Sequence, residues 1–488
     1  MLARPARRST VRRLAGSDAG FLFVESPTQS STCVDIAELG LATDGRGALT
    51  LPELRRHLAE RLHLVPHLRW RIETIPLQIA HPVWVRDADF DLDYHLRELT
   101  VDEPGNPADL DRLVAEHATA PLDRRHPLWQ IVLVHGLAGG RQALVFRFHH
   151  SVADGAGLIT TIGELFSERP VPPAPPFRGE SPSRFRVFLV ALLHQLRAWV
   201  VAPRLLRTTL RRFKATDARR ESAPVPVPRP MGDAPPSRLN RSDDALRTFA
   251  RTRLPLADVQ AVKNAAGTPM SDVVLALVAG ALRRSLLMSG ELPDTPLVVN
   301  VPLGTDPPGA PPRTSGNVFA NFFAYLATDV DDPKERLAAI AANTAESKVQ
   351  LDTLGIDTLP NWLDRFPPAI AGPVARRMAR RLREGEHNPD FNVLVSNVRI
   401  PSDPRSIGTR PFTRFSMSGP VADGAGLNIT VAGCHPHLEV AITANPAAVP
   451  DPHELGALLK GALAELLRAF DLRPTSTTGA TPGASTQR

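Results

Sequence analysis

The residues best suited to chemistry are two adjacent histidines followed by an aspartate and a glycine, in the segment Phe148-His149-His150-Ser151-Val152-Ala153-Asp154-Gly155. Neutral imidazole, with an ordinary pKa near 6.5, accepts a proton from an alcohol or thiol. Asp154 can fold back to fix the loop. Because neighbouring residues on a strand point to opposite faces, one histidine is expected to be catalytic and the other structural. The spacing equally fits two buried histidines that bind backbone groups, and both interpretations stay open.

Metal and nucleophilic chemistry have less support. Cys33 and Cys434 lie far apart, and no further Cys/His cluster offers zinc ligands, so no metal site and no cofactor is predicted. The chain has no G-x-S-x-G elbow, no Walker loop and no G-x-G-x-x-G after a strand. Two isolated cysteines are typical of a reduced, cytosolic compartment.

The histidines require a strand that leads into them and a helix that ends their loop. Alternating and apolar runs predict strands at Trp129–Val134 and Ala143–Phe148, and Asp154 is expected to cap the helix that follows. Further elements are predicted by the same patterns: helices at Asp109–Ala118, Ser271–Leu287 and Asp451–Phe470, and strands at Leu297–Val301 and Asn392–Ser396.

The chain of 488 residues is long enough for a sizeable core, and its prolines divide it. Thirteen of the 48 prolines lie between Pro170 and Pro236, in two clusters around a helical stretch, as expected of an inter-domain crossover. We therefore predict an α/β half at 1–170, a crossover at 171–240 and a second α/β half at 241–472. A tail at 473–488, rich in Thr, Ser, Gly and Pro, is expected to be disordered.

Seven residues occur twice. Val152-Ala153-Asp154-Gly155-Ala156-Gly157-Leu158 returns letter for letter at residues 421–427. Either the two halves are related in fold, or the repeat is chance in a chain rich in Ala, Gly and Val. The second copy lacks the histidines, so related halves would still have one active site.

The formal net charge of +6 is concentrated in one segment. Residues 184–220 hold ten basic residues and one acid, so the rest of the chain carries −3. With 5% aromatic residues and no recognised motif, no nucleic-acid partner is predicted. The segment is amphipathic and fits either a membrane interface or packing on the protein itself. Charged and polar residues at 187–206 argue against a transmembrane helix. The membrane-contact candidates are Trp199, Arg204, Arg207, Arg211 and Arg212.

His149–Gly155 matches the HHxxxDG signature of the CoA-dependent acyltransferase superfamily, and other segments narrow the resemblance. Across residues 14–470 the chain resembles the bacterial wax ester synthase/diacylglycerol acyltransferase family, in segments that follow the family's order. These are residues 14–21 (LAGSDAGF), 81–85 (HPVWV), 90–95 (FDLDYH), 121–129 (PLDRRHPLW), 272–276 (DVVLA), 316–317 (GN), 396–398 (SNV) and 426–430 (GLNIT).

The resemblance implies two chloramphenicol-acetyltransferase-like halves with mixed sheets and a tunnel between them. It also implies transfer of a fatty acyl group from acyl-CoA to diacylglycerol or a long-chain alcohol, with acyl-CoA as co-substrate and no bound cofactor. His150 would be the general base and Asp154 would hold the loop, and His149 and Gly155 complete the candidate catalytic residues of the motif. The tunnel candidates are Pro121, Leu122, Trp129, Asn397 and Asn428.

One position departs from the family. Asn commonly precedes the aspartate of the second-half motif, whereas Ser271 precedes Asp272 here. If that amide stabilises the oxyanion, a serine hydroxyl replaces it with a shorter reach. Alternatively, Ser271 is the N-cap of the following helix.

Two other functions remain open: acyl transfer to a polyketide-derived or glycolipid acceptor, and a catalytically idle lipid-binding protein. A lipid acceptor favours peripheral association with the inner face of the membrane or with lipid droplets.

Overall fold

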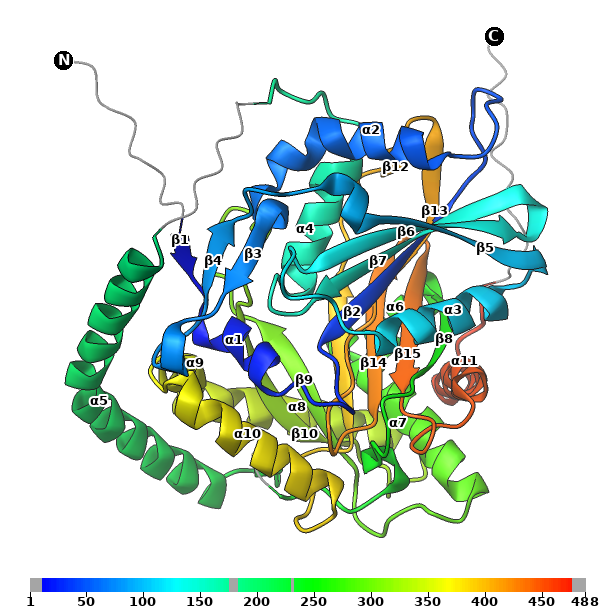
Figure 1. Cartoon of the computed structure of the whole chain (residues 1–488). Helices are drawn as coiled ribbons and strands as arrows, with labels where there is room; N and C mark the ends of the chain where they lie inside the picture. Colours follow the sequence, from blue (N-terminus) through cyan, green and yellow to red (C-terminus); the bar gives the residue numbers. More distant parts are fainter. Residues whose placement is uncertain (1–10, 175–182, 230–231, 476–488) are drawn as a thin grey trace.

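A computed structural model describes residues 11–174, 183–229 and 232–475. The first of two six-stranded sheets has the order β12-β13-β2-β7-β6-β5 (Figure 1). Its strands are β2 (Thr32–Leu39), β5 (Leu96–Gly105), β6 (Trp129–Leu137), β7 (Arg141–His149), β12 (Ser406–Ile407) and β13 (Arg410–Ser416). The sheet is mixed, since β5 runs parallel to β6 while β6, β7, β2 and β13 are antiparallel neighbours.

The second sheet has the order β10-β9-β11-β14-β15-β8 and is also mixed, with β11 parallel to both neighbours. Its strands are β8 (Thr248–Pro255), β9 (Val298–Gly304), β10 (Phe319–Tyr325), β11 (Val393–Arg399), β14 (Leu427–Cys434) and β15 (His437–Ala444). One face is covered by helices that share a single apolar core: α6 (Leu256–Ala266), α7 (Met270–Met288), α8 (Pro333–Leu354) and α11 (Pro452–Ala469).

The two sheets give two sheet-rich halves, which confirms the mixed α/β architecture, while the predicted domain bounds stay a prediction. The first sheet packs on one side against α2 (Leu51–Arg61) and α4 (Gly155–Phe166). On the other side lie α3 (Pro107–Thr119) and two side chains of the second sheet, Phe249 and Ala441. Because β12 and β13 come from the second part of the chain, the first sheet is built from both parts. A tunnel between the halves stays a prediction.

The elements predicted from sequence periodicity are present within a few residues of their expected ends. Trp129–Val134 lies in β6, Ala143–Phe148 in β7, and the helix predicted at Ser271–Leu287 is α7. Strands β6 and β7 have apolar side chains on both faces because both faces are covered. They form a hairpin through the short helix η5 (Ala138–Gly140), where Gly139 adopts φ +75°, a region that glycine enters without steric cost.

A smaller unit stands beside the two sheets. It comprises the three-stranded sheet β1-β4-β3 and the helices α1, α9 and α10. Their bounds are β1 (Val11–Arg13), β3 (Trp70–Glu73), β4 (Val83–Arg86), α1 (Gly16–Phe23), α9 (Thr358–Leu363) and α10 (Pro368–Arg383). Short 3-10 helices complete the chain: η1 (Leu62–Leu64), η2 (Pro66–Arg69), η3 (Pro76–Gln78), η4 (Leu92–His95) and η6 (Arg238–Asn240).

The basic segment forms one helix, α5 (Arg184–Glu221), which runs along the outside of the molecule (Figure 1). It continues through Pro203 and packs against α8. Residues 187–221 include an 18-residue window with mean hydropathy 1.3, of which 17% is buried, so by length and composition this helix could cross a membrane. The transmembrane exclusion drawn from the sequence is therefore not supported by this criterion. Most of the predicted tail lies outside the described residues.

The repeated heptapeptide does not mark equivalent positions in the two halves. In the first half the hairpin β6–β7 leads through the first copy into helix α4. In the second half the hairpin β14–β15 leads into α11, but the second copy stands before β14 and runs into a strand. The halves are similar in plan, but the positions of the two copies favour chance as the origin of the repeat.

Candidate active site

His149 and His150 face different surroundings, as the strand alternation predicts. His149 is the last residue of β7, and the backbone N–H of His150 donates to the carbonyl of Ser31 at 2.8 Å. The loop then turns into α4, where Asp154 is the N-cap and accepts from the N–H of Gly157 at 3.0 Å. The capping prediction for Asp154 is confirmed.

His149 is buried in a structural position, with 2% of its surface exposed. Its Nδ1 lies 2.7 Å from the Ser151 hydroxyl, and its Nε2 lies 3.1 Å from a carboxylate oxygen of Glu25. Burial alone would raise the pKa of Glu25, but His149, the N–H of Ser31 and Arg124 lower it to about 2. This ionised carboxylate holds the imidazole of His149 in place.

His150 is partly exposed and held on several sides. The ring of Phe21 on α1 stacks on it with centroids 4.0 Å apart, and Phe319 on β10 meets it at 6.3 Å. Asn317 Oδ1 lies 3.0 Å from its Nδ1. Burial lowers the pKa of His150 from 6.5, which favours neutral imidazole at neutral pH.

The partners of Asn317 determine which nitrogen of His150 carries the proton. Nδ2 of Asn317 donates to Asp18 Oδ1 and to the backbone carbonyl of His150, both at 2.8 Å. Both of these oxygens are acceptors, so the amide nitrogen must be the atom that faces them. Oδ1 of Asn317 is therefore the atom facing Nδ1 of His150, and it accepts the Nδ1 proton. Neutral His150 then has its lone pair on Nε2. Among the described residues no hydrogen bond occupies that nitrogen, so it is available as a base.

Asp18 anchors this amide from α1. Its Oδ1 accepts from both the backbone N–H and the side-chain Nδ2 of Asn317, each at 2.8 Å. Burial raises the pKa of Asp18 to about 6, although these hydrogen bonds favour the carboxylate. Three segments far apart in sequence thus meet at one imidazole.

Asp154 fastens the histidine loop to the second half of the chain. Its Oδ2 accepts from the backbone N–H of Val318 at 2.9 Å and from the guanidinium of Arg313. Ala153 forms a parallel bridge with Gly316, whose N–H donates to the carbonyl of Val152 at 2.8 Å. Asp154 therefore positions the segment that carries Asn317.

Gly155 lies where this loop meets the second half. A Cβ atom there would come within 3.3 Å of Val398 and 3.8 Å of the Met417 side chain. The small residue lets the N-terminus of α4 approach β11 closely.

The second-half motif lies among different neighbours. Ser271 donates its hydroxyl to Asp272 at 3.2 Å, and the buried Asp272 accepts from Thr344 on α8 at 3.1 Å. Ser271 is the second residue of α7, whose N-cap is Pro269, so the N-cap interpretation of Ser271 was wrong. In the part of the chain that the structure describes, no hydrogen bond links Ser271 or Asp272 to His150. The oxyanion role stays a prediction.

The tunnel candidates are dispersed. Trp129 is fully buried in the core, where its Nε1 donates to the carbonyl of Leu68 at 2.7 Å. Asn428 is buried, donates to the carbonyl of Pro420 and accepts from Thr430. Pro121 and Asn397 are exposed, and Leu122 packs against the first-half core. Within residues 11–174, 183–229 and 232–475 no group of three His, Cys, Asp or Glu residues could hold a metal ion.

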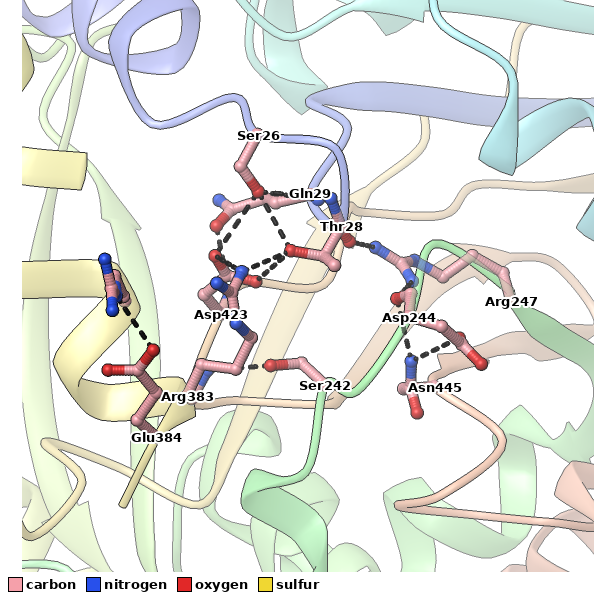
Figure 2. A network of polar contacts seen from close by, with 12 residues as sticks. Ser26, Thr28, Gln29, Ser242, Asp244, Arg247, Arg383, Glu384, Asp423 and Asn445 are labelled. Atoms are coloured by element: carbon pink, nitrogen blue, oxygen red, sulfur yellow. Dashed lines mark hydrogen bonds and ion pairs between the residues drawn. The ribbon is translucent and has the colours of Figure 1, made fainter. Parts of the chain in front are cut away.

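The second heptapeptide is the centre of another polar junction between the halves (Figure 2). The buried carboxylate of Asp423 accepts from Thr28 at 3.2 Å and from Ser26 and Arg383 at 3.4 Å. The backbone N–H of Asp423 donates to Gln29 at 2.9 Å. This junction holds residues 26–29, which directly precede the Ser31 carbonyl that binds His150.

Comparisons with known proteins identify the family of this chain. A model of the wax ester synthase/diacylglycerol acyltransferase catalytic domain matches residues 14–274, and a model of the C-terminal domain of the same proteins matches residues 315–467. The chain belongs to the wax ester synthase/diacylglycerol acyltransferase family. A Mycobacterium tuberculosis protein named as a candidate diacylglycerol O-acyltransferase is 32% identical over 466 residues, covering 95% of this chain and 97% of that protein.

Solved structures share the fold of this family member. The wax ester synthase/diacylglycerol acyltransferase of Marinobacter aquaeolei VT8 aligns with TM-score 0.66 and 24% identity, over 94% of this chain and 100% of that one. The first condensation domain of the calcium-dependent antibiotic synthetase aligns with TM-score 0.56 and 19% identity, over 95% and 97%.

The sequence did not identify three residues that build the site: Asp18, Arg313 and Asn317. Asp18 and Asn317 lie within segments that carried the family resemblance, LAGSDAGF and GN. Their positions were a signal of membership, but their contact with His150 was not predicted.

Proposed function

We propose that this family member transfers a long-chain fatty acyl group from acyl-CoA to the hydroxyl of diacylglycerol or of a fatty alcohol. The observation that supports this most is the Asn317 amide oxygen 3.0 Å from Nδ1 of His150, an imidazole whose burial lowers its pKa and so favours the neutral form. The relative named as a candidate diacylglycerol O-acyltransferase supports the choice of acceptor. An organised base also argues against an idle lipid-binding protein.

In this mechanism Nε2 of His150 takes the proton of the acceptor hydroxyl as the oxygen attacks the thioester carbonyl. The tetrahedral intermediate collapses, the C–S bond breaks, and the departing CoA sulfur receives the proton from His150. General base catalysis of this kind contributes about 10²- to 10⁴-fold. Both N–H groups of Asn317 are already engaged, so this amide orients the base and leaves the oxyanion to other donors.

The test is transfer from palmitoyl-CoA to diolein and to hexadecanol by wild type, His150→Ala and His453→Ala. His453 is exposed and distant in sequence from the site, so its variant is the matched control. We expect His150→Ala to lose about 10²-fold or more in kcat. Wild type that acylates neither acceptor would refute the function, and a fully active His150→Ala would refute the assigned base.

We also propose that α5 contacts the membrane or a lipid droplet on its cytoplasmic side. Eleven large apolar side chains of α5 are exposed, among them Trp199 at 54%. Arg204, Arg207 and Arg211 are exposed beside them, and a groove of about 470 Å³ lies along Pro203–Lys214. Exposed apolar surface of this extent is typical of an interaction site, and each basic residue adds up to about 1 kcal/mol on anionic lipid.

Arg212 does not belong to this contact set. Its guanidinium binds Asp357 at 2.8 Å and Thr358 at 2.7 Å, next to and within α9. The test variant therefore replaces Arg204, Arg207 and Arg211 by Gln. The control variant replaces three other arginines by Gln: Arg56, Arg284 and Arg399. Flotation with anionic vesicles is then compared between the two variants and wild type. Unchanged flotation would refute the contact. Extraction with alkaline carbonate releases a peripheral protein and retains one that spans the bilayer.

A further inference from the structure

Helix α10 presents an unpartnered apolar row on a strongly basic helix. Ile370, Val374 and Met378 follow at intervals of four residues and therefore share one face. They are 51%, 61% and 40% exposed, and the buried residues of α10 are only Pro368 and Gly372. Packing among the residues that the structure describes does not explain a row of this kind.

A fourth apolar side chain is exposed on a neighbouring element with an unusual backbone. Helix η3 contacts α10, and its residues Leu77 and Gln78 adopt φ +57° and +50°. A left-handed conformation is unfavourable for leucine, and such strain is typically kept at functional sites. Here it accompanies an exposure of 84% for Leu77, higher than that of any other large apolar residue described.

The charge of α10 indicates what kind of surface would cover this row. The helix contains five arginines and no acid. Arg380 pairs with Glu384 and Arg381 with Glu386, whereas Arg376 and Arg377 make no ion pair among the described residues. Arg377, three residues after Val374, lies beside the apolar row, whereas Arg376 lies towards Gly372 on another side of the helix. An apolar row with an unpaired arginine beside it, on a helix with five arginines, fits the interface of an anionic bilayer, where the apolar groups enter and the guanidinium groups meet phosphates.

This surface is connected to the active site through α1. α9 and α10 both pack on α1. The N–H of Gly16 at the start of α1 donates to the Asp364 carboxylate, which follows α9, at 2.5 Å. α1 in turn carries Phe21, which stacks on His150, and Asp18, which binds Asn317. A lipid acceptor at α10 would be one helix away from the base.

We infer that α10 and η3 form a docking surface for anionic phospholipid bilayers, separate from α5, which brings the lipid acceptor beside α1. This inference rests on the proposed acyl transfer. Disruption of the surface should weaken binding to anionic vesicles. It should also slow acylation of an acceptor held in a bilayer, while acylation of a short-chain alcohol dissolved in water stays unchanged.

The test variant is Leu77→Asn combined with Val374→Asn. Asparagine tolerates the left-handed backbone at position 77, so the fold is not put at risk there. The matched control is Leu41→Asn combined with Leu246→Asn, two leucines that are 66% and 58% exposed elsewhere. Thermal unfolding establishes that all variants are folded. A further variant, Arg376→Gln with Arg377→Gln, tests the charge.

We expect the Leu77/Val374 variant to bind phosphatidylglycerol/phosphatidylcholine vesicles at least tenfold more weakly, while the control double variant is unchanged. Its activity on diolein in those vesicles should fall in parallel, and its activity on dissolved butanol should stay within twofold of wild type. The arginine variant should lose the preference for phosphatidylglycerol.

Equal vesicle binding by wild type and the Leu77/Val374 variant would overturn the inference. So would a variant that leaves vesicle binding intact but converts a dimer into a monomer, because a second copy would then be the occupant. Wild type without activity on any acceptor would refute the proposed function instead, and vesicle binding would still judge the docking surface by itself.

Discussion

Replacing Asn317 by alanine tests whether the proton on Nδ1 of His150 is held by its neighbour. The variant removes the Oδ1 acceptor 3.0 Å from Nδ1 and the two donations of Nδ2. Neutral His150 can then carry its proton on Nε2, where it cannot act as a base. A hydrogen bond of this kind contributes about 0.5–1.5 kcal/mol net, which corresponds to a roughly 2- to 12-fold lower kcat.

The same change leaves Asp18 with one donor fewer. Its Oδ1 keeps the backbone N–H of residue 317 at 2.8 Å, so the cost in unfolding free energy should be about 1–3 kcal/mol without loss of the fold. The assay is kcat and KM for hexadecanol with palmitoyl-CoA. We expect kcat to fall and KM to change little, because the amide is proposed to act through the imidazole.

A swapped variant supplies the rescue. Asp18→Asn with Asn317→Asp keeps an acceptor on Nδ1 and a donor from position 18, and it conserves the total charge. A carboxylate on Nδ1 favours imidazolium, so activity should partly return with the acid limb of kcat/KM moved to higher pH. An Asn317→Ala enzyme with unchanged kcat would refute the tautomer argument. A loss as large as that of His150→Ala would instead place Asn317 on the reacting atoms.

Three further predictions concern the groups around this site. Burial raises the pKa of Asp18 from 3.8 to about 6, so its ionisation lowers the free energy of unfolding as pH rises between these values. Asp18→Asn should remove this loss of stability, which amounts to up to about 3 kcal/mol. Denaturant titrations at pH 4 and pH 7 measure it. Arg313→Ala removes a donor to Asp154 and should cost about 2 kcal/mol and lower kcat, measured by urea unfolding and palmitoyl-CoA turnover. Gly16→Ala would place a Cβ 2.3 Å from the backbone of Leu363, so purified variant should melt well below wild type in calorimetry.

Sequence reasoning succeeded where chemistry and local pattern coincide. His150 and Asp154 are close in sequence, the strand alternation separates His149 from His150, and the cap follows from residue type. Asn317 is 167 positions from His150, and it reaches the site only because Asp154 and Gly316 join two segments of different halves. That contact depends on tertiary packing, which no local periodicity encodes.

The wrong expectation of a helix cap at Ser271 has a local cause. Ser271 was given a possible capping role because serine is a common cap, but Pro269 already ends the preceding loop with an extended backbone (φ −59°, ψ 152°), so the helix begins one residue before the serine. For Trp129, a tunnel candidate by resemblance alone, the structure shows a buried indole whose N–H is satisfied. Its tunnel role stays a prediction.

The repeated heptapeptide shows how one sequence serves two local structures. In the first copy Asp154 is the cap of a helix, and in the second the corresponding Asp423 precedes a strand. Yet each aspartate uses its carboxylate in the same way, since Asp154 binds Val318 of the second half and Asp423 binds Thr28 of the first. The two junctions are therefore reciprocal, and the loops they hold carry Asn317 and Ser31, which both hydrogen-bond to His150. The active site therefore lies at the boundary of the two halves: Asp154 of the first half holds the loop with Asn317, and Asp423 of the second half holds the loop with Ser31.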